Sequence, residues 1–448
     1  HQVSWLIDGV PVPNTNIASN VGPQFDPKDV DYLEVQTGGY SAEYGDRAYG
    51  VFNVLPRTGF ERDREAELVL SFGNFRQTND EFSFGDHNDR RAYYVSLNGN
   101  RSDFGLATPT ADVLHDRQSG FGGFGSLVYL PSDKDQLRLV ASVRSDHYQI
   151  PNDQGAQLAG IDDVENESDA FVNFSWIRNI GHDLLLTVSP LYHFNRADFI
   201  GGPNDVPLSP QDRRDSHYAG GQVSVGALTK KHDLRAGIYS FFQHDSSFFG
   251  IKANDGSGTD LAQDEKINGG VEALFVEDQY KALKWLTLTG GVRLTHFGAS
   301  INENAASPRT GAAIRIPKIN LILRGSYGRY YQAPPLLTVS GPLLDLAATQ
   351  GFGFLPLRGE RDEQYEFGAA LPLKGWDFAA GYFHTHARNY FDHNAIGDSN
   401  IFFPLTITAA FIRGEEVTVS SPKLFKRASL HLAYSHQTAE GEGAITGG

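Results

Sequence analysis

The stretch WLTLTGGVRLTHF, Trp285–Phe297, decides the fold because two kinds of side chain alternate along it. One face carries Leu286, Leu288, Gly290, Val292 and Leu294, and the other carries Thr287, Thr289, Gly291, Arg293 and Thr295. A period of two residues is that of a β-strand, whose successive side chains point to opposite sides. The stretch therefore predicts a strand with one apolar face and one polar face.

The same alternation recurs along most of the chain. Further examples are EAELVLSF at 65–72, KDQLRLVASVRSD at 134–146, INLILRGSYGRYY at 319–331 and KRASLHLAYSH at 426–436. Such runs are about 9–15 residues long, whereas soluble strands have about 5–6 and tilted membrane-spanning strands about 9–11. About 17 runs lie between Glu65 and Gln437, and short and long connections separate them. The pattern predicts an all-β transmembrane antiparallel barrel with an apolar outside and a wet lumen.

Aromatic residues gather near the predicted strand ends, as Tyr330 and Tyr331 do. Girdles of Tyr and Phe at the two membrane interfaces would place them there. The alternative is that aromatic residues simply favour strands. We expect a girdle.

Composition excludes several classes of function. The 448 residues include no Cys, so disulfides, thiol nucleophiles and Cys-based metal sites are absent. The net charge of −16 argues against a nucleic-acid partner. The chain also has no Met, for which we have no physical account, and its start does not resemble a signal peptide. We expect an internal fragment of a longer protein.

The first 58 residues follow a different pattern. VSWLIDGVPVP at 3–13 predicts a strand and a turn at Asp8-Gly9, and PKDVDYLEV at 27–35 predicts a helical turn before a strand. SAEYGDRAYGVFNV at 41–54 predicts a turn rich in Gly and a further strand. We expect a small α/β unit at residues 1–59 and the barrel at 60–448.

These residues resemble the end of the plug domain of TonB-dependent outer-membrane receptors. The resemblance lies in DGVPV ending at Val12, in P-x-x-V-x-x-(I/L)-E-V from Pro27, and in small-x-x-Y-G-x-x-A-x-G-V-(I/F)-N-V from Ser41. Two departures occur: Tyr49 replaces the first of two usual glycines, and Leu55-Pro56-Arg57-Thr58 follows where Thr-Lys is usual. The AEYG form is similar to a subgroup that carries an N-terminal carboxypeptidase-regulatory-like domain.

Barrel segments resemble the same family in order and spacing. They are Leu274–Leu294, Ser307–Gly311, Arg324–Leu336, Arg361–Leu371 and Ile412–Ser421. The resemblance implies a barrel of 22 strands in the full-length protein, of which about 17 are present here. It also implies that a signal peptide, the segment contacting TonB and the first half of the plug precede this sequence, and that the last strands follow it.

The resemblance further implies a receptor in the outer membrane of a Gram-negative-type bacterium. Its partners would be a TonB-type energy-transducing complex, outer-membrane lipid and a scarce ligand such as a siderophore, cobalamin, oligosaccharide or peptide. Uptake would combine binding at the outer loops with gating by the plug, without bond chemistry or a cofactor. The alternatives are a passive porin-like channel and a soluble secreted β-rich binding protein.

The plug motif supplies the candidate site residues. They are Asp8, Gly9, Glu34, Glu43, Tyr44, Gly45, Arg47, Gly50 and Asn53. The resemblance places the polar members from Glu43 to Arg47 at the contact between plug and barrel. The alternative for these is a solvated loop, and for Asp8-Gly9 a plain β-turn.

One predicted strand supplies candidates for ligand contact. In GYFHTHARNYFDH, one face carries Tyr382, His384, His386 and Arg388, and we expect it to line the lumen. His-x-His on a strand can bind a metal, but without a third ligand we expect a hydrogen-bonded pair and no metal site.

Acidic residues do not form a recognisable site in the sequence. Asp162 and Asp163 are adjacent, so on a strand they would face opposite sides. Calcium binding is possible at the loop acids Asp255, Asp260, Asp264 and Glu265, but they lack EF-hand spacing. Because no nucleophile, phosphate-binding or zinc-protease motif is present either, we expect no enzymatic activity.

Overall fold

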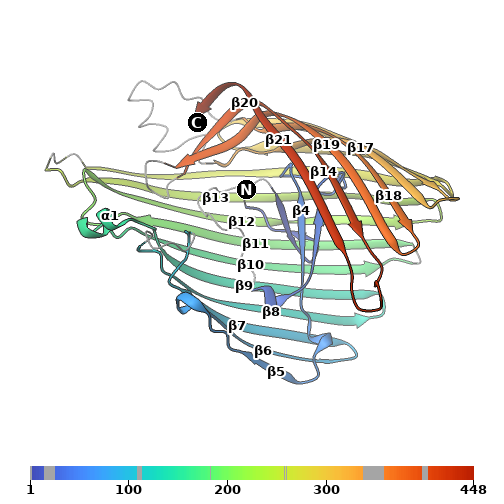
Figure 1. Ribbon diagram of the computed structural model, residues 1–448, viewed down its shortest axis with the longest axis horizontal. Helices are drawn as coiled ribbons and strands as arrows, with labels where there is room; N and C mark the ends of the chain where they lie inside the picture. Colours follow the sequence, from blue (N-terminus) through green and yellow to red (C-terminus); the bar gives the residue numbers. More distant parts are fainter. Residues whose placement is uncertain are drawn as a thin grey trace.

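The structure is a computed structural model that describes residues 3–14, 26–107, 114–181, 183–256, 258, 260–336, 358–395 and 402–447. Its elements form a small four-stranded sheet and a barrel of seventeen strands (Figure 1). The small sheet lies within the curve of the barrel. Its strands and connections, residues 3–56, are called the plug segment below, and the surrounding strands are called the wall.

The plug segment contains the predicted strands and helical turn. Its strands are β1 (Ser4–Ile7), β2 (Val10–Pro11), β3 (Val30–Gln36) and β4 (Val51–Pro56), in the spatial order β2-β1-β4-β3. The 3-10 turn η1 (Pro27–Asp29) precedes β3, and the Asp26 side chain caps it by accepting from the Lys28 amide at 2.9 Å. β1 and β4 are parallel, whereas the other two pairs are antiparallel.

The wall strands follow one another in chain order. They are β5 (Glu65–Val69), β6 (Thr78–Asn88), β7 (Arg91–Ser102), β8 (Gln118–Ser132), β9 (Asp135–Gln149), β10 (Val164–Asn179), β11 (Leu184–Ile200), β12 (Leu208–Leu228), β13 (His232–Ala253), β14 (Leu261–Leu283), β15 (Leu286–Gly298), β16 (Asn302–Ile316), β17 (Leu321–Gln332), β18 (Glu360–Leu373), β19 (Trp376–Ala395), β20 (Phe402–Ser420) and β21 (His431–Gly447). Among the described residues, the connections contain two 3-10 turns, η2 (Gly59–Glu61) and η3 (Asn74–Arg76), and one helix, α1 (Gln154–Ala159). Within the described residues, no helix is long and apolar enough to cross a membrane.

The strand pairing confirms the predicted antiparallel barrel of about 17 strands. Each consecutive pair from β5–β6 to β20–β21 is antiparallel, and in strand order β21 returns next to β5. An odd number of alternating strands makes these two run in the same direction. Between β21 and β5, the described residues do not show the residue-by-residue pairing that the consecutive strands show. Tight turns such as Ser132 to Asp135 lie at one end, and the longer connections, including α1, lie at the other.

Several strands are longer than the sequence predicted. β12, β13 and β14 have 21, 22 and 23 residues, well beyond the length needed to cross a bilayer. They include the polar residues 208–216 and 261–266. Paired strands therefore extend past the apolar belt at the long-connection end.

The two faces of β14 differ in exposure. Leu274 and Val276 point outward and are 53% and 42% exposed, whereas the alternating Ala273 and Phe275 point inward and are 2% and 3% exposed. An apolar outer face is stable only against lipid, so this alternation matches the predicted membrane orientation.

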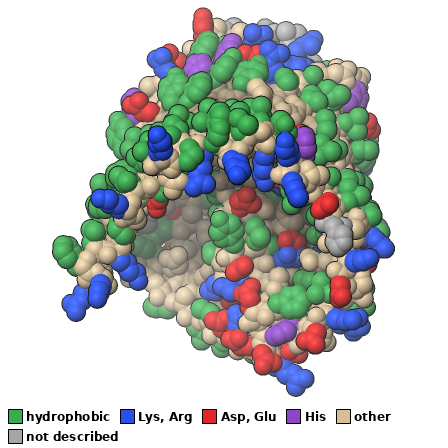
Figure 2. All heavy atoms as spheres, turned by 90° about the vertical axis from the view of Figure 1, so that its right-hand side faces the viewer, with side chains coloured by type: hydrophobic (Ala, Val, Ile, Leu, Met, Phe, Trp, Pro, Cys, Tyr) green, Lys and Arg blue, Asp and Glu red, His purple; other side chains and the backbone are tan. Residues whose placement is uncertain are grey.

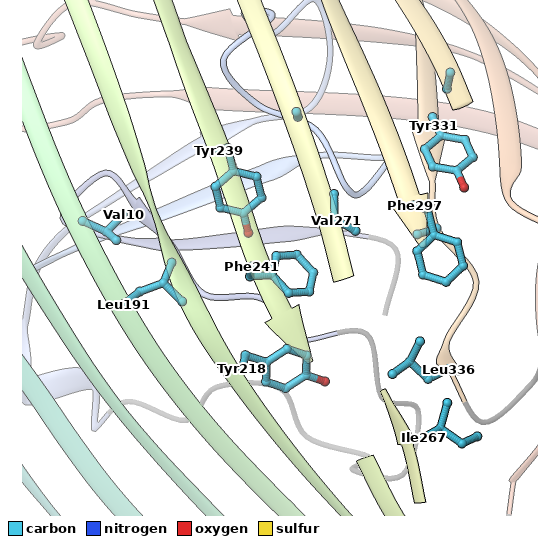
Figure 3. Close-up of a cluster of buried hydrophobic side chains, with 13 residues drawn as sticks. Val10, Leu191, Tyr218, Tyr239, Phe241, Ile267, Val271, Phe297, Tyr331 and Leu336 are labelled. Atoms are coloured by element: carbon cyan, nitrogen blue, oxygen red, sulfur yellow. The ribbon is translucent and has the colours of Figure 1, made fainter. Parts of the chain in front are cut away.

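The lumen is less wet than the alternation predicted. A cluster of buried side chains joins Val10 of the plug segment to Tyr239 and Phe241 of β13 and to Leu191 and Tyr218 of neighbouring strands (Figure 3). Large apolar and aromatic groups thus point inward wherever the plug segment covers the wall. Part of the lumen is a packed core.

The girdle prediction is wrong for Tyr330 and Tyr331. Both lie near the C-terminal end of β17, and each is 4% exposed. The Tyr330 ring lies 4.7 Å from that of Tyr40 in the plug segment, and the Tyr331 hydroxyl donates to Glu303 at 2.9 Å. Position at a strand end did not reveal that these rings are buried and that Tyr330 contacts the plug segment.

Leu274→Arg should impair folding into lipid, because it places a charge on the lipid-facing side of β14. The expected cost is about 2–4 kcal/mol, measured by denaturant unfolding in lipid vesicles. The control is Gln279→Arg, on the inward phase of the same strand at an exposed position, which should unfold like the parent. Equal loss in both variants would contradict the assigned faces.

Candidate functional site

The connection between β3 and β4 forms most of the contact with the wall. Residues 40–48, called the contact loop below, pack against the inner faces of strands β12 to β18. The loop turns tightly, since the Tyr44 amide donates to the Ser41 carbonyl at 3.0 Å. Gly45 is required by close approach, because a Cβ there would lie 2.2 Å from Arg293 Nε.

Arg309 of β16 makes the densest set of hydrogen bonds to this loop. Its Nη1 donates to the carbonyls of Tyr40, at 3.0 Å, and Ser41, and its Nη2 donates to the Tyr44 carbonyl at 2.6 Å. The guanidinium also lies over the Tyr330 ring, 4.5 Å from its centroid. Arg309 is only 6% exposed, so these partners replace its hydration shell.

Arg293 of β15 holds the next part of the loop. Its Nη1 donates to the Glu43 carbonyl at 2.9 Å, and its Nη2 lies 3.2 Å from Asp46 Oδ1. The side chain is 2% exposed and lies over the Tyr239 ring at 5.4 Å. A buried charge is tolerated only when it is paired and hydrogen-bonded, and the contact loop supplies both.

Acceptors and amides on the wall complete the contact. Glu277 Oε2 accepts from the Ala42 amide at 2.7 Å, and Gln364 Nε2 donates to the Ala48 carbonyl at 2.6 Å. The Glu43 side chain accepts from Gln222 Nε2 at 2.7 Å. The wall thus forms hydrogen bonds with both amides and carbonyls of the loop backbone. The directions of these bonds, as well as the charges, hold the loop in place.

A second contact lies at the Asp8-Gly9 turn. Both residues have positive φ, at 55° and 75°, as the sequence predicted for a turn. Asp8 also forms an ion pair of 2.5 Å with Arg138 of β9, whose Nη2 donates to the Pro56 carbonyl at 3.1 Å. Burial raises the pKa of Asp8, and the Arg138 charge opposes that shift. The turn therefore serves as a docking point as well as a bend.

A third contact joins η1 to β7. The Tyr94 hydroxyl donates to Asp29 Oδ1 at 3.1 Å, and both residues are buried. Burial raises the pKa of the Asp29 carboxyl to about 6, and hydrogen bonds from Ser96 and Tyr94 limit the shift.

The remaining plug-motif residues hold the plug segment together internally. Asn53 Oδ1 accepts from the Gly9 amide at 2.9 Å, and Asn53 Nδ2 donates to Glu34 Oε2 at 3.4 Å. The buried Arg47 donates to the Asn14 carbonyl, and the Gly50 carbonyl accepts from the Ser4 amide at 2.8 Å. The motif thus divides into residues that shape the segment and residues that touch the wall.

The predicted ligand-contact face of β19 lies on the opposite side from that expected. Thr385 pairs with Gln364, which reaches the contact loop, so Thr385 and its neighbour Ala387 face inward and are buried. His384 and His386 alternate with them and therefore lie on the outer face, with Tyr382 and Arg388. The inner face is the one with small residues because the plug lies close to it, and polarity alone did not reveal this.

A cavity adjoins the contact loop at the end with the tight turns. Its volume is about 1160 Å³, and its lining includes Gln36 of β3, Arg235 and Glu366. Seen from that end, the molecule is hollowed and carries acidic and basic groups at the mouth (Figure 2). The contact loop thus has packed wall on one side and open space on the other.

Sequence reasoning did not single out the wall residues of this site. Arg293 was assigned only to a polar face, and Arg309, Glu277 and Gln364 lay unremarked within family-like segments. A usable signal was present, since each is a long polar side chain on the inward phase of a strand. The loop that meets them comes from a segment more than 170 residues away.

Arg309→Ala should loosen the contact loop, because three backbone carbonyls lose a charged donor. The expected loss is about 2–4 kcal/mol of local stability, seen as faster amide hydrogen exchange across residues 40–48. Arg315→Ala, on an exposed position of the same strand, is the matched control. Unchanged exchange in Arg309→Ala would contradict the proposed role of this arginine.

The plug segment should become less stable as pH rises from about 4 to 6. A carboxyl whose pKa is raised on folding binds more protons when folded, so stability falls with pH across that window, by at most about 3 kcal/mol. Asp29→Asn should remove this dependence in thermal unfolding, and Asp31→Asn, at an exposed position on β3, should retain it. A pH profile identical in all three proteins would refute the assignment.

Comparisons with known proteins agree on one family. Residues 151–448 match the model of the TonB dependent receptor-like β-barrel, and residues 1–51 match the TonB-dependent receptor plug domain. The sequence has no significant match among curated proteins.

Solved structures of this fold superpose over nearly the whole chain. The copper transporter OprC has a TM-score of 0.74 at 15% identity, with 97% of this chain and 72% of that chain covered. The ferric yersiniabactin uptake receptor FyuA from Yersinia pestis has a TM-score of 0.76 at 13% identity, covering 99% and 71%. The ferripyoverdine receptor of Pseudomonas aeruginosa has a TM-score of 0.73 at 13% identity, covering 99% and 65%.

The family is one of transporters without enzymatic activity, which act in uptake across the outer membrane of Gram-negative bacteria. With its barrel model matched over well more than half of the sequence, this chain belongs to the TonB-dependent receptor family.

Proposed function

We propose that this chain takes up a scarce ligand by energy-coupled transport, with residues 1–59 acting as the gate inside a barrel formed by residues 60–448. The observation that carries the proposal is the set of hydrogen bonds from Arg293, Arg309 and Gln364 to backbone carbonyls of the contact loop. They hold the plug segment across the lumen. Transport then requires these bonds to be broken or rearranged.

The chemistry of the contact suits a gate that must release. Most of its bonds join a charged or amide side chain to backbone, and water can replace each such bond when the loop moves. An apolar contact of similar extent would instead expose its surface to water on release. A pull on the plug can therefore open the contact one bond at a time.

The ligand would bind at the end with long connections, which faces outward in this family, and a TonB-type partner would act from the opposite end. Siderophores, cobalamin, oligosaccharides and peptides are the ligand classes to test. A copper transporter and two receptors for iron chelates share the fold, but identities of 13–15% support the fold alone. Any ligand contact by His384 or His386 would occur on the outer surface of the barrel.

Single-channel recording of the full-length receptor tests the gate. The parent should show little conductance, and the Arg293→Ala/Arg309→Ala double variant should open frequently, because the loop loses both arginines. Arg315→Ala should behave like the parent. A large and permanently open pore in the parent would favour a passive porin-like channel instead.

Uptake measurements in cells test the energy coupling. Binding of a labelled ligand from each class should persist after the proton-motive force is collapsed, whereas its accumulation should stop. Continued accumulation without that force would overturn the proposal even if the gate behaves as expected.

A further inference from the structure

A buried histidine of the wall meets the chain that follows β2. His193 of β11 is 1% exposed, and its ring stacks on that of Tyr218 in β12, with the ring centroids 5.4 Å apart. His193 Nδ1 lies 2.7 Å from the Pro13 carbonyl oxygen. Asn195, two residues further along β11, donates through Nδ2 to Asn14 Oδ1 at 3.2 Å. Residues 13–14 of the plug segment therefore dock on β11, and this contact is called the β11 docking point below.

Both ring nitrogens of His193 face oxygen atoms that accept hydrogen bonds. Nδ1 faces the Pro13 carbonyl, and Nε2 lies 2.7 Å from Asp169 Oδ2 of β10. A neutral imidazole carries one N–H and satisfies only one of these acceptors, whereas the imidazolium carries two and satisfies both. If the proton lies on Asp169 instead, the pair still holds the same number of protons. The docked geometry therefore requires one proton more than a neutral histidine and an ionised carboxylate hold together.

The charges around the pair leave Asp169 as the partner of His193. Arg144 of β9 donates to both carboxylate oxygens of Asp146, at 2.6 and 2.9 Å, so its charge is already matched within that strand. Among the described residues, no Lys or Arg forms an ion pair with Asp169, whose side chain is 20% exposed. An opposite charge at this distance favours the protonated form of a histidine. The Asp169 carboxylate therefore stabilises the imidazolium that the docked geometry requires.

We propose that His193 is a positioning residue for the plug segment and that it holds residues 13–14 against the wall in its doubly protonated form. Loss of the proton leaves one ring nitrogen, now an acceptor, facing another acceptor, and it leaves the Asp169 charge unmatched. The β11 docking point is therefore stronger in acid and weaker in alkali. Its part in opening the lumen rests on the proposed function, whereas the docking itself does not.

The sign of the pH effect follows from the bound proton. A contact that holds an extra proton loses stability as pH rises above about 6.5, the ordinary value for histidine. The other charged or titratable groups that face the site are Arg47 of the contact loop, Arg144 and Asp146 of β9, Glu167 and Asp169 of β10, and Tyr218 of β12. Carboxyl groups ordinarily titrate below about pH 5, and tyrosine and arginine at about pH 10 and above. Histidine is the group that ordinarily titrates between these limits.

Amide hydrogen exchange of the purified full-length receptor tests the docking point, through protection factors of residues 10–14 at about pH 6 and pH 9. Protection in the parent should fall at least about tenfold between the two pH values. His193→Gln should show low protection at both, because it cannot hold the proton. The control is His217→Gln on the exposed face of β12, where Nδ1 lies 2.8 Å from the Tyr192 hydroxyl, and it should follow the parent. Protection that does not change with pH in the parent would overturn the proposal.

Asp169→Asn separates proton linkage from a merely structural contact. The new amide can donate to Nε2 of a neutral imidazole, whose Nδ1–H still donates to the Pro13 carbonyl. Residues 10–14 should therefore stay protected at both pH values, and the pH dependence should disappear. A variant that keeps the pH dependence of the parent, or that loses protection at both pH values, would refute the role of the bound proton.

Single-channel recordings at the same two pH values connect the docking point to the gate. The parent should open more often at about pH 9 than at pH 6, because the β11 docking point is weaker there. Asp169→Asn should open equally often at both. If exchange depends on pH as expected but opening does not, the docking point stands and the proposed gate is contradicted.

Discussion

The guanidinium groups of Arg293 and Arg309 are buried between the wall and the plug segment, and the position of the plug depends on satisfying them. A buried arginine needs a partner for each donor, and the wall alone does not provide enough acceptors. The contact loop provides acceptors for the terminal Nη groups through its backbone carbonyls and Asp46, whereas the Nε of each arginine is buried without a partner. Moving the loop away would leave two charges inside the lumen, with only water to replace the lost partners.

This requirement explains several features around the loop. Gly45 leaves space for the Arg293 side chain, and the Arg309 guanidinium lies over the adjacent rings of Tyr330 and Tyr40. Glu277 accepts from the loop amide at Ala42, so the loop is held through donors and acceptors alike. Because backbone groups do most of the pairing, the contact constrains the path of the loop more than the identity of its side chains.

The sequence predicted the barrel well because alternation with a period of two is a local property that each strand shows by itself. The turn at Asp8-Gly9 and the positions of the plug strands along the sequence were also predicted from local patterns. The direction of the side chains was harder to predict. His384 and His386 were placed in the lumen because polarity was used to separate inside from outside, and Tyr330 was placed in a membrane girdle because it lies near a strand end. Where the plug fills the lumen, the inner wall carries small or aromatic residues, and the polarity rule fails there. The inward phase of the strands marked the wall residues as candidates, but their pairing with the contact loop was not predictable, because it depends on contacts between segments more than 170 residues apart.

The two ends of the molecule are built for different tasks. At the end with tight turns, a cavity of about 1160 Å³ lies beside β3 and the contact loop, so the plug segment has room to move on that side. At the opposite end, β12, β13 and β14 continue as paired strands beyond the apolar belt, and Asn204 and Asn254 tie their connections together. A receptor needs a binding surface that keeps its shape while the gate beneath it changes. Extending the strands outward provides such a surface, because its rigidity comes from strand pairing in the wall and does not depend on where the plug segment lies.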